Sequence, residues 1–346
     1  MRAAFLKTEG HLVMIDVQMP TIQSPDQILI KVKTVGICGS EAHAFRGSHP
    51  FRKAPVILGH EMAGDVVSVG ESVLNFKTGD RVIVDPQWTC GECAYCRAGD
   101  INLCPSKRML GTSSWPGAFG EYIIAPVKSV LHLPDSLSST QGSLIEPLSV
   151  AVHVARRANV SAHKSVAILG SGSVGGMLVG VCHAYGAEPI VAVDIHEHCL
   201  DIARKRMGAT HSLLAPDEKL ADRVNDLTRG EGVDVVFVTA DEPILVTQGV
   251  EMAKRRGRIM LVALLTGSPL HLGAYEILSK ELEIVGNMSI NHEDVQQAIA
   301  LAMSGQVDVN AIATHVLPIE EAQRGMELAL TKDDGAIKVI LSFDTT

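Results

Sequence analysis

A chain of 346 residues is long enough for about two domains, each large enough to bury a core of its own. With 30 basic and 39 acidic residues the formal net charge is −9, so the chain lacks the broad cationic surface that nucleic acid or an anionic membrane would require. The longest purely apolar run, residues 259–265, is far shorter than a membrane span, and the composition is that of a globular protein that binds neither partner.

The N-terminal segment has no secretory pattern. Polar and charged residues interrupt each of its apolar stretches, at Lys7, Glu9, His11 and Asp16. We therefore expect a cytoplasmic location, where thiols stay reduced. The chain has seven cysteines, an odd number, and a dense group of cysteines in such a compartment indicates a metal site rather than disulfides.

Residues 1 to about 145 form a β-rich region. Short apolar runs at 28–32, 66–69 and 81–84 are separated by glycine, proline, asparagine and aspartate, which favour turns. Long helical periodicity is scarce in this half of the chain. The pattern predicts short strands joined by tight turns.

A first group of potential metal ligands lies in this β-rich region. Cys38 lies in the run GICGSEAH (36–43), and His60 and Glu61 lie in the run GHEMAG (59–64). Thiolate, imidazole and carboxylate together suit a catalytic zinc ion, because fewer than four fixed protein ligands leave a position for water or substrate. Taken singly, each residue has a plainer explanation, as a small buried hydrophobe, a core histidine or a surface acid.

The second group is a lobe of four cysteines. They have the spacing C-x2-C-x2-C-x7-C and are Cys90, Cys93, Cys96 and Cys104. Four thiolates can enclose one tetrahedral ion and leave no position for substrate, which is typical of structural zinc. An iron–sulfur cluster is the alternative, but its bacterial motif has a shorter last interval. We therefore predict a structural zinc lobe over about 88–106.

Helical periodicity begins at Glu146. Apolar residues then recur at helical spacing, and Pro147 is in a position that a first helical turn tolerates. We expect this helix to connect the two domains. Beyond it, apolar runs alternate with helical stretches, which predicts a parallel, doubly wound sheet. The expected strands are 166–169, 190–193, 233–238 and 259–265, and the first two are followed by helices that reach about Tyr185 and Met207.

A glycine motif follows the first of these strands. Gly170, Gly172 and Gly175 form a G-x-G-x-x-G that opens a helix, and Asp194 ends the next strand. Gly170 permits a tight turn, Gly172 lets the backbone approach a pyrophosphate, and Gly175 lets helix and strand pack closely. A tight turn without a ligand is the alternative. The predicted cofactor-binding residues are Gly170, Gly172, Ser173, Val174, Gly175, Asp194, Ala263 and Leu264.

Asp194 bears on which dinucleotide would bind. Its carboxylate would accept hydrogen bonds from the adenosine ribose hydroxyls. It would repel a 2′-phosphate by on the order of 4 kcal/mol per unit charge at 4 Å and an effective dielectric constant near 20. The sequence therefore predicts NAD rather than NADP.

The C-terminal part mixes two expected helices, about 293–303 and 319–330, with a closing strand at 337–343. The placement of these elements does not follow from the pattern alone. No internal repeat, low-complexity tract or long linker interrupts the chain.

Together these motifs resemble the zinc-dependent medium-chain dehydrogenases, and within them the polyol (sorbitol-type) branch. The resemblance covers essentially the whole chain and rests on the runs around Cys38 and His60, the four-cysteine lobe, GAFGEY (117–122) and EPL (146–148). It implies an α/β fold in which a GroES-like, β-rich catalytic domain is interrupted by a Rossmann domain with a doubly wound parallel sheet. The expected bounds are 1–147 and 286–346 for the catalytic domain and 148–285 for the NAD-binding domain.

The resemblance also implies roles for site residues. Cys38 and His60 would be zinc ligands, with Glu61 a third or exchangeable one. Glu146 would ligate zinc or hold its water, in the place where many alcohol dehydrogenases have a cysteine. Ser40 and His43 match a proton relay from the substrate hydroxyl through the cofactor ribose to the surface. The chain would then use NAD and two zinc ions, one catalytic and one structural.

The reaction implied is the interconversion of a secondary alcohol, in a polyol, sugar alcohol or sugar acid, and the corresponding ketone by hydride transfer. A threonine- or butanediol-type dehydrogenase is the alternative, and a catalytically silent NAD-binding protein is a further one. The stretch that contains Arg46, Ser48, His49 and Arg52 could suit a sugar acid or phosphate, or form a solvated loop. Relatives in the branch imply a homotetramer, with a dimer as the alternative.

Overall fold

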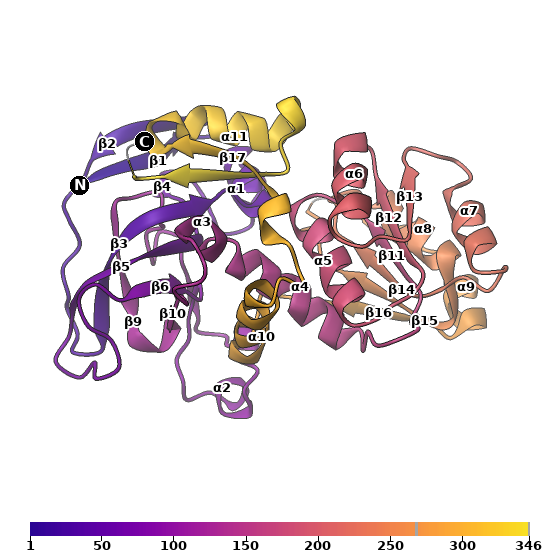
Figure 1. Ribbon diagram of the computed structural model, residues 1–346, viewed down its shortest axis with the longest axis horizontal. Helices are drawn as coiled ribbons and strands as arrows, with labels where there is room; N and C mark the ends of the chain where they lie inside the picture. Colours follow the sequence, from indigo (N-terminus) through magenta and orange to yellow (C-terminus); the bar gives the residue numbers. More distant parts are fainter. Residues whose placement is uncertain (267–268, 345–346) are drawn as a thin grey trace. The chain divides into compact units, whose positions relative to one another are not determined.

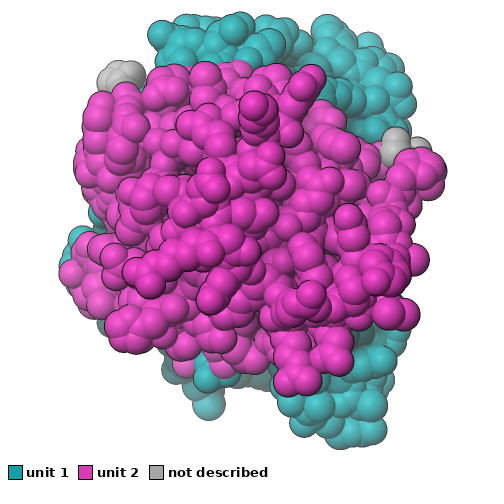
Figure 2. Space-filling model, turned by 90° about the vertical axis from the view of Figure 1, so that its right-hand side faces the viewer, with its two compact units in different colours: residues 1–146, 291–295, 313–346 teal, residues 147–290, 296–312 magenta. Residues whose placement is uncertain are grey.

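A mixed sheet and a parallel sheet organise the chain, in a computed structural model that describes residues 1–266 and 269–344 (Figure 1). Two units form around these sheets, shown in different colours in Figure 2. Unit 1 comprises residues 1–146, 291–295 and 313–346, and unit 2 comprises residues 147–290 and 296–312. Among the described residues, no helix combines the length and apolar content needed to cross a membrane.

Unit 1 is β-rich, as its turn-rich sequence predicts. Its main sheet has the order β10-β6-β5-β3-β18-β17, with β9 also paired to β3, and smaller sheets are β2-β1-β4 and β7-β8. The strands are β1 (Arg2–Thr8), β2 (His11–Asp16), β3 (Gln27–Gly36), β4 (Val56–Ile57), β5 (Glu61–Val69), β6 (Arg81–Val84), β7 (Gln87–Trp88), β8 (Arg108–Met109), β9 (Tyr122–Pro126), β10 (Val130–His132), β17 (Ala313–Pro318) and β18 (Lys338–Ser342). The α-helices are α1 (Gly39–Phe45), α2 (Ala94–Ala98), α3 (Ser139–Gly142) and α11 (Ala322–Thr331).

The C-terminal segment completes the main sheet of unit 1. β18 pairs antiparallel with β3, with Ile340 opposite Gly36, and parallel with β17. α11 packs on β18, so the yellow C-terminal ribbon lies beside the indigo N-terminal strands in Figure 1. The last strand of the chain therefore reaches the end of β3 that leads to Cys38.

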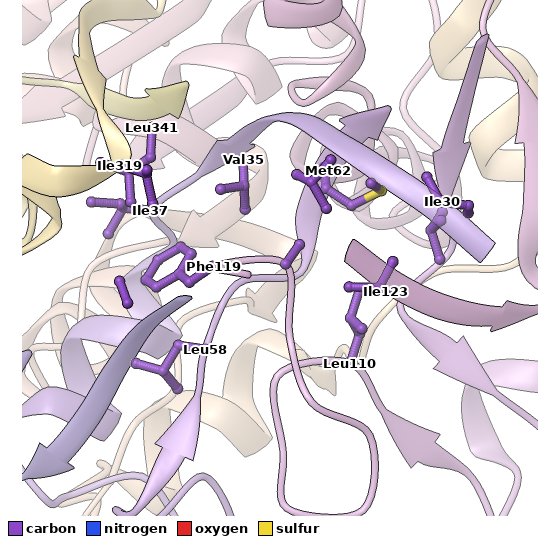
Figure 3. Packing of buried hydrophobic residues seen from close by; sticks show 14 of the residues in the cluster. Ile30, Val35, Ile37, Leu58, Met62, Leu110, Phe119, Ile123, Ile319 and Leu341 are labelled. Atoms are coloured by element: carbon purple, nitrogen blue, oxygen red, sulfur yellow. The ribbon is translucent and has the colours of Figure 1, made fainter. Parts of the chain in front are cut away.

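The core of unit 1 lies around the centre of this sheet. Alternating side chains of β3 and β5, such as Ile30 and Met62, are almost fully buried, and Phe119 lies close to Ile37 and Leu58 (Figure 3). Burying each such side chain contributes about 1.5–3 kcal/mol. This packing holds the ends of β3 and β5 in place.

Unit 2 contains a six-stranded parallel sheet with the order β13-β12-β11-β14-β15-β16. The strands are β11 (Val166–Leu169), β12 (Ile190–Asp194), β13 (His211–Leu214), β14 (Val233–Val238), β15 (Ala253–Leu261) and β16 (Glu283–Gly286). The helices are α5 (Ser173–Ala184), α6 (Glu197–Lys205), α7 (Leu220–Leu227), α8 (Ile244–Met252) and α9 (Ala274–Lys280). The order and the parallel pairing confirm the predicted doubly wound sheet.

Two helices belong to both units. α4 (Ile145–Arg157) begins in unit 1 and continues in unit 2, where the sequence predicts the connecting helix. α10 (His292–Met303) also begins in unit 1 and continues in unit 2. We expected the chain to return to the first domain at residue 286 and to stay there. In the structure, residues 296–312 group with unit 2, and the chain returns to unit 1 for good at residue 313. Val307, for example, packs against Gly180 of α5.

The expected strand at 259–265 is shifted in the structure. β15 starts earlier, over a charged stretch that carries no apolar signal, and ends at Leu261. The N–H groups of Val262 and Ala263 both donate to the carbonyl oxygen of Val238, at 3.0 Å each, where the chain leaves the sheet. The edge strands β13 and β16 were not predicted, since they are mostly half-exposed and lack an apolar run.

Candidate active site

Cys38 and His60 come from neighbouring strand ends. β3 and β5 pair antiparallel with Gly36 opposite Glu61. Cys38 follows β3 as the N-cap residue of α1, and His60 directly precedes β5. A Cβ atom at Gly36 would lie 2.2 Å from Glu61 Oε2, so glycine at this position leaves the space that the Glu61 carboxylate occupies.

The predicted ligands form two overlapping groups. Cys38, Glu41 and His60 offer ligand atoms within 4.8 Å of one another, and so do His60, Glu61 and Glu146. Glu146 reaches the group from the first turn of α4. We call Cys38, His60, Glu61 and Glu146 the catalytic cluster. Its thiolate, imidazole and carboxylates are donors that zinc accepts, so the residues present fit a zinc ion.

Glu41 was not among the predicted site residues. Its Oε1 lies 2.5 Å from His60 Nδ1, and its Oε2 accepts the Cys38 N–H at 3.0 Å. This contact leaves Nε2 of His60 for a metal, as when a carboxylate orients a histidine ligand. Burial would raise the pKa of Glu41, but the charge and hydrogen bond of His60 hold it below its usual range. The available signal was local, because glutamate at the third helical position is typical of a helix cap.

Lys338 was also missed. Its Nζ donates to both carboxylate oxygens of Glu61, at 2.8 and 2.7 Å, and to the Ile37 carbonyl oxygen at 3.1 Å. Both side chains are almost fully buried. Burial would lower the pKa of Lys338, but the charge of Glu61 raises it above its ordinary value. No sequence motif marks this pair, because Lys338 arrives through the register of β18.

The two glutamates of the catalytic cluster differ in their partners. Both oxygens of Glu61 accept hydrogen bonds from Lys338, whereas among the described residues no lysine or arginine donates to the carboxylate of Glu146. Burial raises the pKa of Glu146 to about 7, with His60 opposing the shift and Glu61 adding to it. Of the two carboxylates, Glu146 therefore has oxygens that are more available to a ligand than those of Glu61.

The two predicted relay residues lie on α1. Ser40 and His43 are three positions apart, so they face the same side of the helix. Arg52 Nη1 donates to Ser40 Oγ at 2.9 Å, and His43 Nδ1 lies 3.0 Å from Ser48 Oγ. Ser40 therefore accepts a hydrogen bond from the arginine side chain of Arg52, a contact that the sequence did not predict.

The basic stretch after α1 is not a uniform solvated loop. Arg46 and Ser48 are exposed, but His49 and Arg52 are buried. His49 Nδ1 accepts the backbone N–H groups of Phe51 and Arg52, at 3.3 and 2.9 Å. Burial, together with the charge of Arg52, lowers the pKa of His49 to about 4, so its ring is neutral.

The four cysteines lie as their spacing predicts. Their sulfur atoms lie within 4.8 Å of one another, and all four residues are free thiols. Backbone N–H groups point at three of the sulfurs: Cys93 N–H at Cys90, Cys96 N–H at Cys93 and Cys90 N–H at Cys104. Such N–H groups stabilise thiolate charge, so the lobe fits a closed tetrahedral zinc site.

The glycine motif has the geometry that a dinucleotide needs. Gly170 has φ +103°, and a Cβ atom at Gly175 would lie 1.8 Å from the Gly170 carbonyl oxygen. A Cβ atom at Gly172, the N-cap residue of α5, would meet no atom within 4 Å. The Ser173 Oγ is buried and has no hydrogen-bond partner among the described residues. Open space and an unpartnered hydroxyl at a helix N-terminus fit a pyrophosphate group.

The remaining predicted cofactor residues lie at the same carboxyl edge of the sheet. Asp194 ends β12 and accepts the N–H groups of Ser171 at 2.6 Å and His196 at 2.9 Å. Ala263 and Leu264 follow β15, where the Ala263 N–H donates to the end of β14. In doubly wound sheets ligands bind at this edge, so the placement fits a nicotinamide dinucleotide.

Comparison with known proteins gives matches along nearly the whole chain. The alcohol dehydrogenase GroES-like domain family matches residues 24–135, and the zinc-binding dehydrogenase family matches residues 173–304. Sorbitol dehydrogenase of Bacillus subtilis is 36% identical over 345 residues, which cover 99% of this chain and 97% of the relative. D-arabitol-phosphate dehydrogenase of Enterococcus avium is 32% identical over 334 residues, which cover 96% and 94%.

A solved structure supports the same relationship. The crystal structure of an oxidoreductase/dehydrogenase of unknown specificity from Escherichia coli matches with a TM-score of 0.93 and 33% identity over 99% of both chains. The similarity in sequence and in fold to these proteins thus extends over both units and is not confined to a single motif. The chain belongs to the zinc-dependent medium-chain dehydrogenases, in their polyol branch, and is an alcohol/polyol oxidoreductase.

Proposed function

We propose that this protein is an NAD-dependent zinc dehydrogenase that interconverts a secondary alcohol, in a polyol, sugar alcohol or sugar acid, and the corresponding ketone. The observation that carries the proposal is that His60 lies within 4.8 Å, ligand atom to ligand atom, of Cys38 in one group and of Glu146 in another, with Ser40 two positions after Cys38. The sorbitol and arabitol-phosphate dehydrogenases among its relatives support a polyol-like substrate.

Cys38, His60 and Glu146 would hold the catalytic ion. We favour Glu146 over Glu61 as the direct ligand because both oxygens of Glu61 already accept hydrogen bonds from Lys338. The four cysteines would hold a second, structural ion. When bound, zinc supplies Lewis acidity and NAD supplies a hydride acceptor.

The chain's own residues would orient the substrate and move its proton. Ser40 Oγ would accept the proton of the substrate hydroxyl while its own hydroxyl proton passes on toward His43, whose imidazole would hand a proton to solvent. Arg52 donates to one lone pair of Ser40 Oγ and so restricts the rotation of that hydroxyl. Glu41 holds His60 in one orientation, and Lys338 does the same for Glu61.

Two finer features belong to the same proposal. Asp194 would accept the adenosine ribose hydroxyls, which favours NAD, and a higher kcat/KM with NADP than with NAD would overturn that choice. We also propose a homotetramer with a cytoplasmic location. Analytical ultracentrifugation that finds a dimer or monomer at micromolar concentration would overturn the tetramer.

The deciding experiment measures NADH appearance with polyols, sugar acids, threonine and simple diols, with and without a chelator, on protein of known zinc content. We expect turnover of secondary alcohols, loss of turnover with the chelator, and two zinc ions per chain. A preference for primary aliphatic alcohols, or turnover that resists the chelator, would contradict the proposal. If threonine or butanediol is the preferred substrate, the protein is a threonine- or butanediol-type dehydrogenase of the same branch.

A further inference from the structure

A buried cation without an ion pair lies beside Ser40. Arg52 is 3% exposed, and within residues 1–266 and 269–344 no acidic side chain pairs with its guanidinium. Glu41 lies near enough for Arg52 to lower its pKa, but its two oxygens accept from His60 and from the Cys38 backbone. A buried charge that has no counter-charge is costly, so proteins rarely retain one without a use.

Lys338 provides the contrast within the same unit. Among the described residues Lys338 and Arg52 are the buried lysine and arginine side chains, and Glu61 accepts two hydrogen bonds from Lys338. Arg52 uses its Nη1 for Ser40 Oγ and its Nη2 for the Leu110 carbonyl oxygen, and its Nε is buried with no hydrogen-bond partner among the described residues. The guanidinium carries five N–H donors, so more than half of them have no partner in the part of the chain that the structure describes.

The surroundings hold this guanidinium in place. The backbone N–H of Arg52 is fixed on the neutral ring of His49, at 2.9 Å. The main chain at Gly111, which has φ +83°, packs close to the side chain, because a Cβ atom there would lie 3.6 Å from Arg52 Nε. The planar fork of arginine matches the two oxygens of a carboxylate or phosphate better than any other side chain does. The missing counter-charge is therefore one that a ligand can supply.

We propose that Arg52 is the anion-binding residue of the substrate site, and that the physiological substrate carries a carboxylate or phosphate group close to the hydroxyl that is oxidised. The inference rests on the proposed function, in which Ser40 contacts that hydroxyl, because Arg52 Nη1 lies 2.9 Å from Ser40 Oγ. Neutral polyols leave the guanidinium unpaired and are poor substrates for that reason.

The first test uses the wild-type holoenzyme. Values of kcat/KM with NAD are compared for neutral hexitols, the corresponding aldonates and the corresponding hexitol phosphates. We expect one anionic class to exceed the neutral hexitols by about 10-fold or more. The aldonate and phosphate arms show which anion the site takes. Equal values for neutral and anionic substrates would overturn the proposal.

The second test uses variants of Arg52. Arg52→Gln keeps donors for Ser40 and removes the charge. Any change in the orientation of Ser40 affects both substrate classes, so the readout is the ratio of the two kcat/KM values, and we expect kcat/KM for the anionic substrate to fall about 10- to 100-fold more than that for neutral hexitols. Arg52→Lys keeps the positive charge but lacks the planar guanidinium, so its kcat/KM for the anionic substrate should lie between those of the wild type and Arg52→Gln. Arg46→Gln is the matched control, since it removes an exposed arginine six positions earlier and should leave both values unchanged.

A binding measurement separates this inference from the proposed function. Calorimetric titration of the zinc-loaded protein with gluconate and with sorbitol 6-phosphate should give a dissociation constant that rises about 10- to 100-fold in Arg52→Gln and stays unchanged in Arg46→Gln. If no alcohol is oxidised but this difference is found, the dehydrogenase proposal fails and the anion site stands. If neutral polyols are oxidised and neither anion binds, the anion site fails and the dehydrogenase proposal stands. Should Arg52→Gln not fold, Arg52→Lys and the wild-type comparison decide.

Discussion

The four-cysteine lobe and the catalytic cluster are both suited to zinc, but they are assembled in different ways. The lobe takes all its ligands from one stretch, 90–104, and its own backbone N–H groups point at the sulfurs. The catalytic cluster takes its residues from the start of α1, the start of β5 and the first turn of α4. It is also surrounded by further charged side chains, two of which are buried in contact with it.

The difference follows from what each site must do. A closed set of four identical ligands needs only a tight loop, because the ion itself compensates the thiolate charge. An open set of mixed ligands has to stay in place when a position is free for substrate, so its geometry must come from the protein. Glu41 and Lys338 supply it through buried hydrogen bonds to His60 and Glu61. Loss of either support should therefore affect the catalytic cluster and not the lobe.

The largest effect is expected from Cys38→Ser. Serine is a poor zinc ligand, so kcat/KM should fall at least about 10³-fold as several kcal/mol of Lewis-acid stabilisation are lost. Zinc content should drop from two ions to one per chain, with the lobe still loaded. Cys182→Ala, at a buried cysteine of α5 outside both groups, is the control. Full turnover with two ions bound in Cys38→Ser would contradict the assignment of the catalytic cluster.

Lys338→Met tests the buried ion pair. The variant leaves the carboxylate of Glu61 buried without its cation, which should lower the free energy of unfolding by about 3–5 kcal/mol. Denaturant unfolding measures the change. Lys33→Met removes a partly exposed pair with Asp344 and should cost no more than about 1 kcal/mol.

The double variant Lys338→Met/Glu61→Gln sharpens this comparison. Removing both charges should recover part of the lost stability, because no unpaired charge then remains in the core. If the double variant is less stable than Lys338→Met alone, the pair does not act as an isolated ion pair. The charge of Glu61 would then serve the metal site directly.

The contrast between the two sites also explains what could be predicted from sequence. The cysteine spacing and the glycine motif are local patterns, and the structure has both as compact local arrangements. Cys38 and His60 were candidate ligands from their residue types, each with a plain alternative, and only resemblance to a family gave them that role; Glu146 was predicted through the resemblance alone. The parallel sheet followed from its apolar runs, although its half-exposed edge strands carried no such signal.

The residues that sequence reasoning missed are positioned by contacts far apart in the chain. Lys338 meets Glu61 across 277 residues, through the pairing of β18 with β3. Arg52 was named in the sequence, with its role left open between anion binding and a solvated loop, and its contact with Ser40, 12 positions earlier, was not predicted. Burial decides the meaning of such residues, and burial of a charged side chain is a property of the packed fold that composition does not encode.

A smaller effect on affinity is expected from Glu41→Gln. The amide still reaches His60 but lacks the charge that favours the correct tautomer, so zinc affinity at the catalytic cluster should fall about 10- to 100-fold. Competition with a chelator of known affinity measures this, with the four-cysteine lobe as an internal control in the same molecule. An equal loss from both sites would mean that Glu41 supports the fold of unit 1 and not the orientation of His60.

The smallest effect on turnover is expected from Cys104→Ser. This change opens the lobe, so one zinc ion should be lost and residues 88–106 should become sensitive to protease. The catalytic cluster keeps all of its residues and their buried partners Glu41 and Lys338, so kcat per zinc-loaded catalytic site should change by less than about twofold at a temperature where the variant is folded. Stopped-assay rates normalised to zinc content measure this. A large fall in kcat would show that the geometry of the catalytic cluster at the end of β3 depends on an intact lobe. The two sites would then be one structural unit, although the lobe takes its ligands from one short stretch.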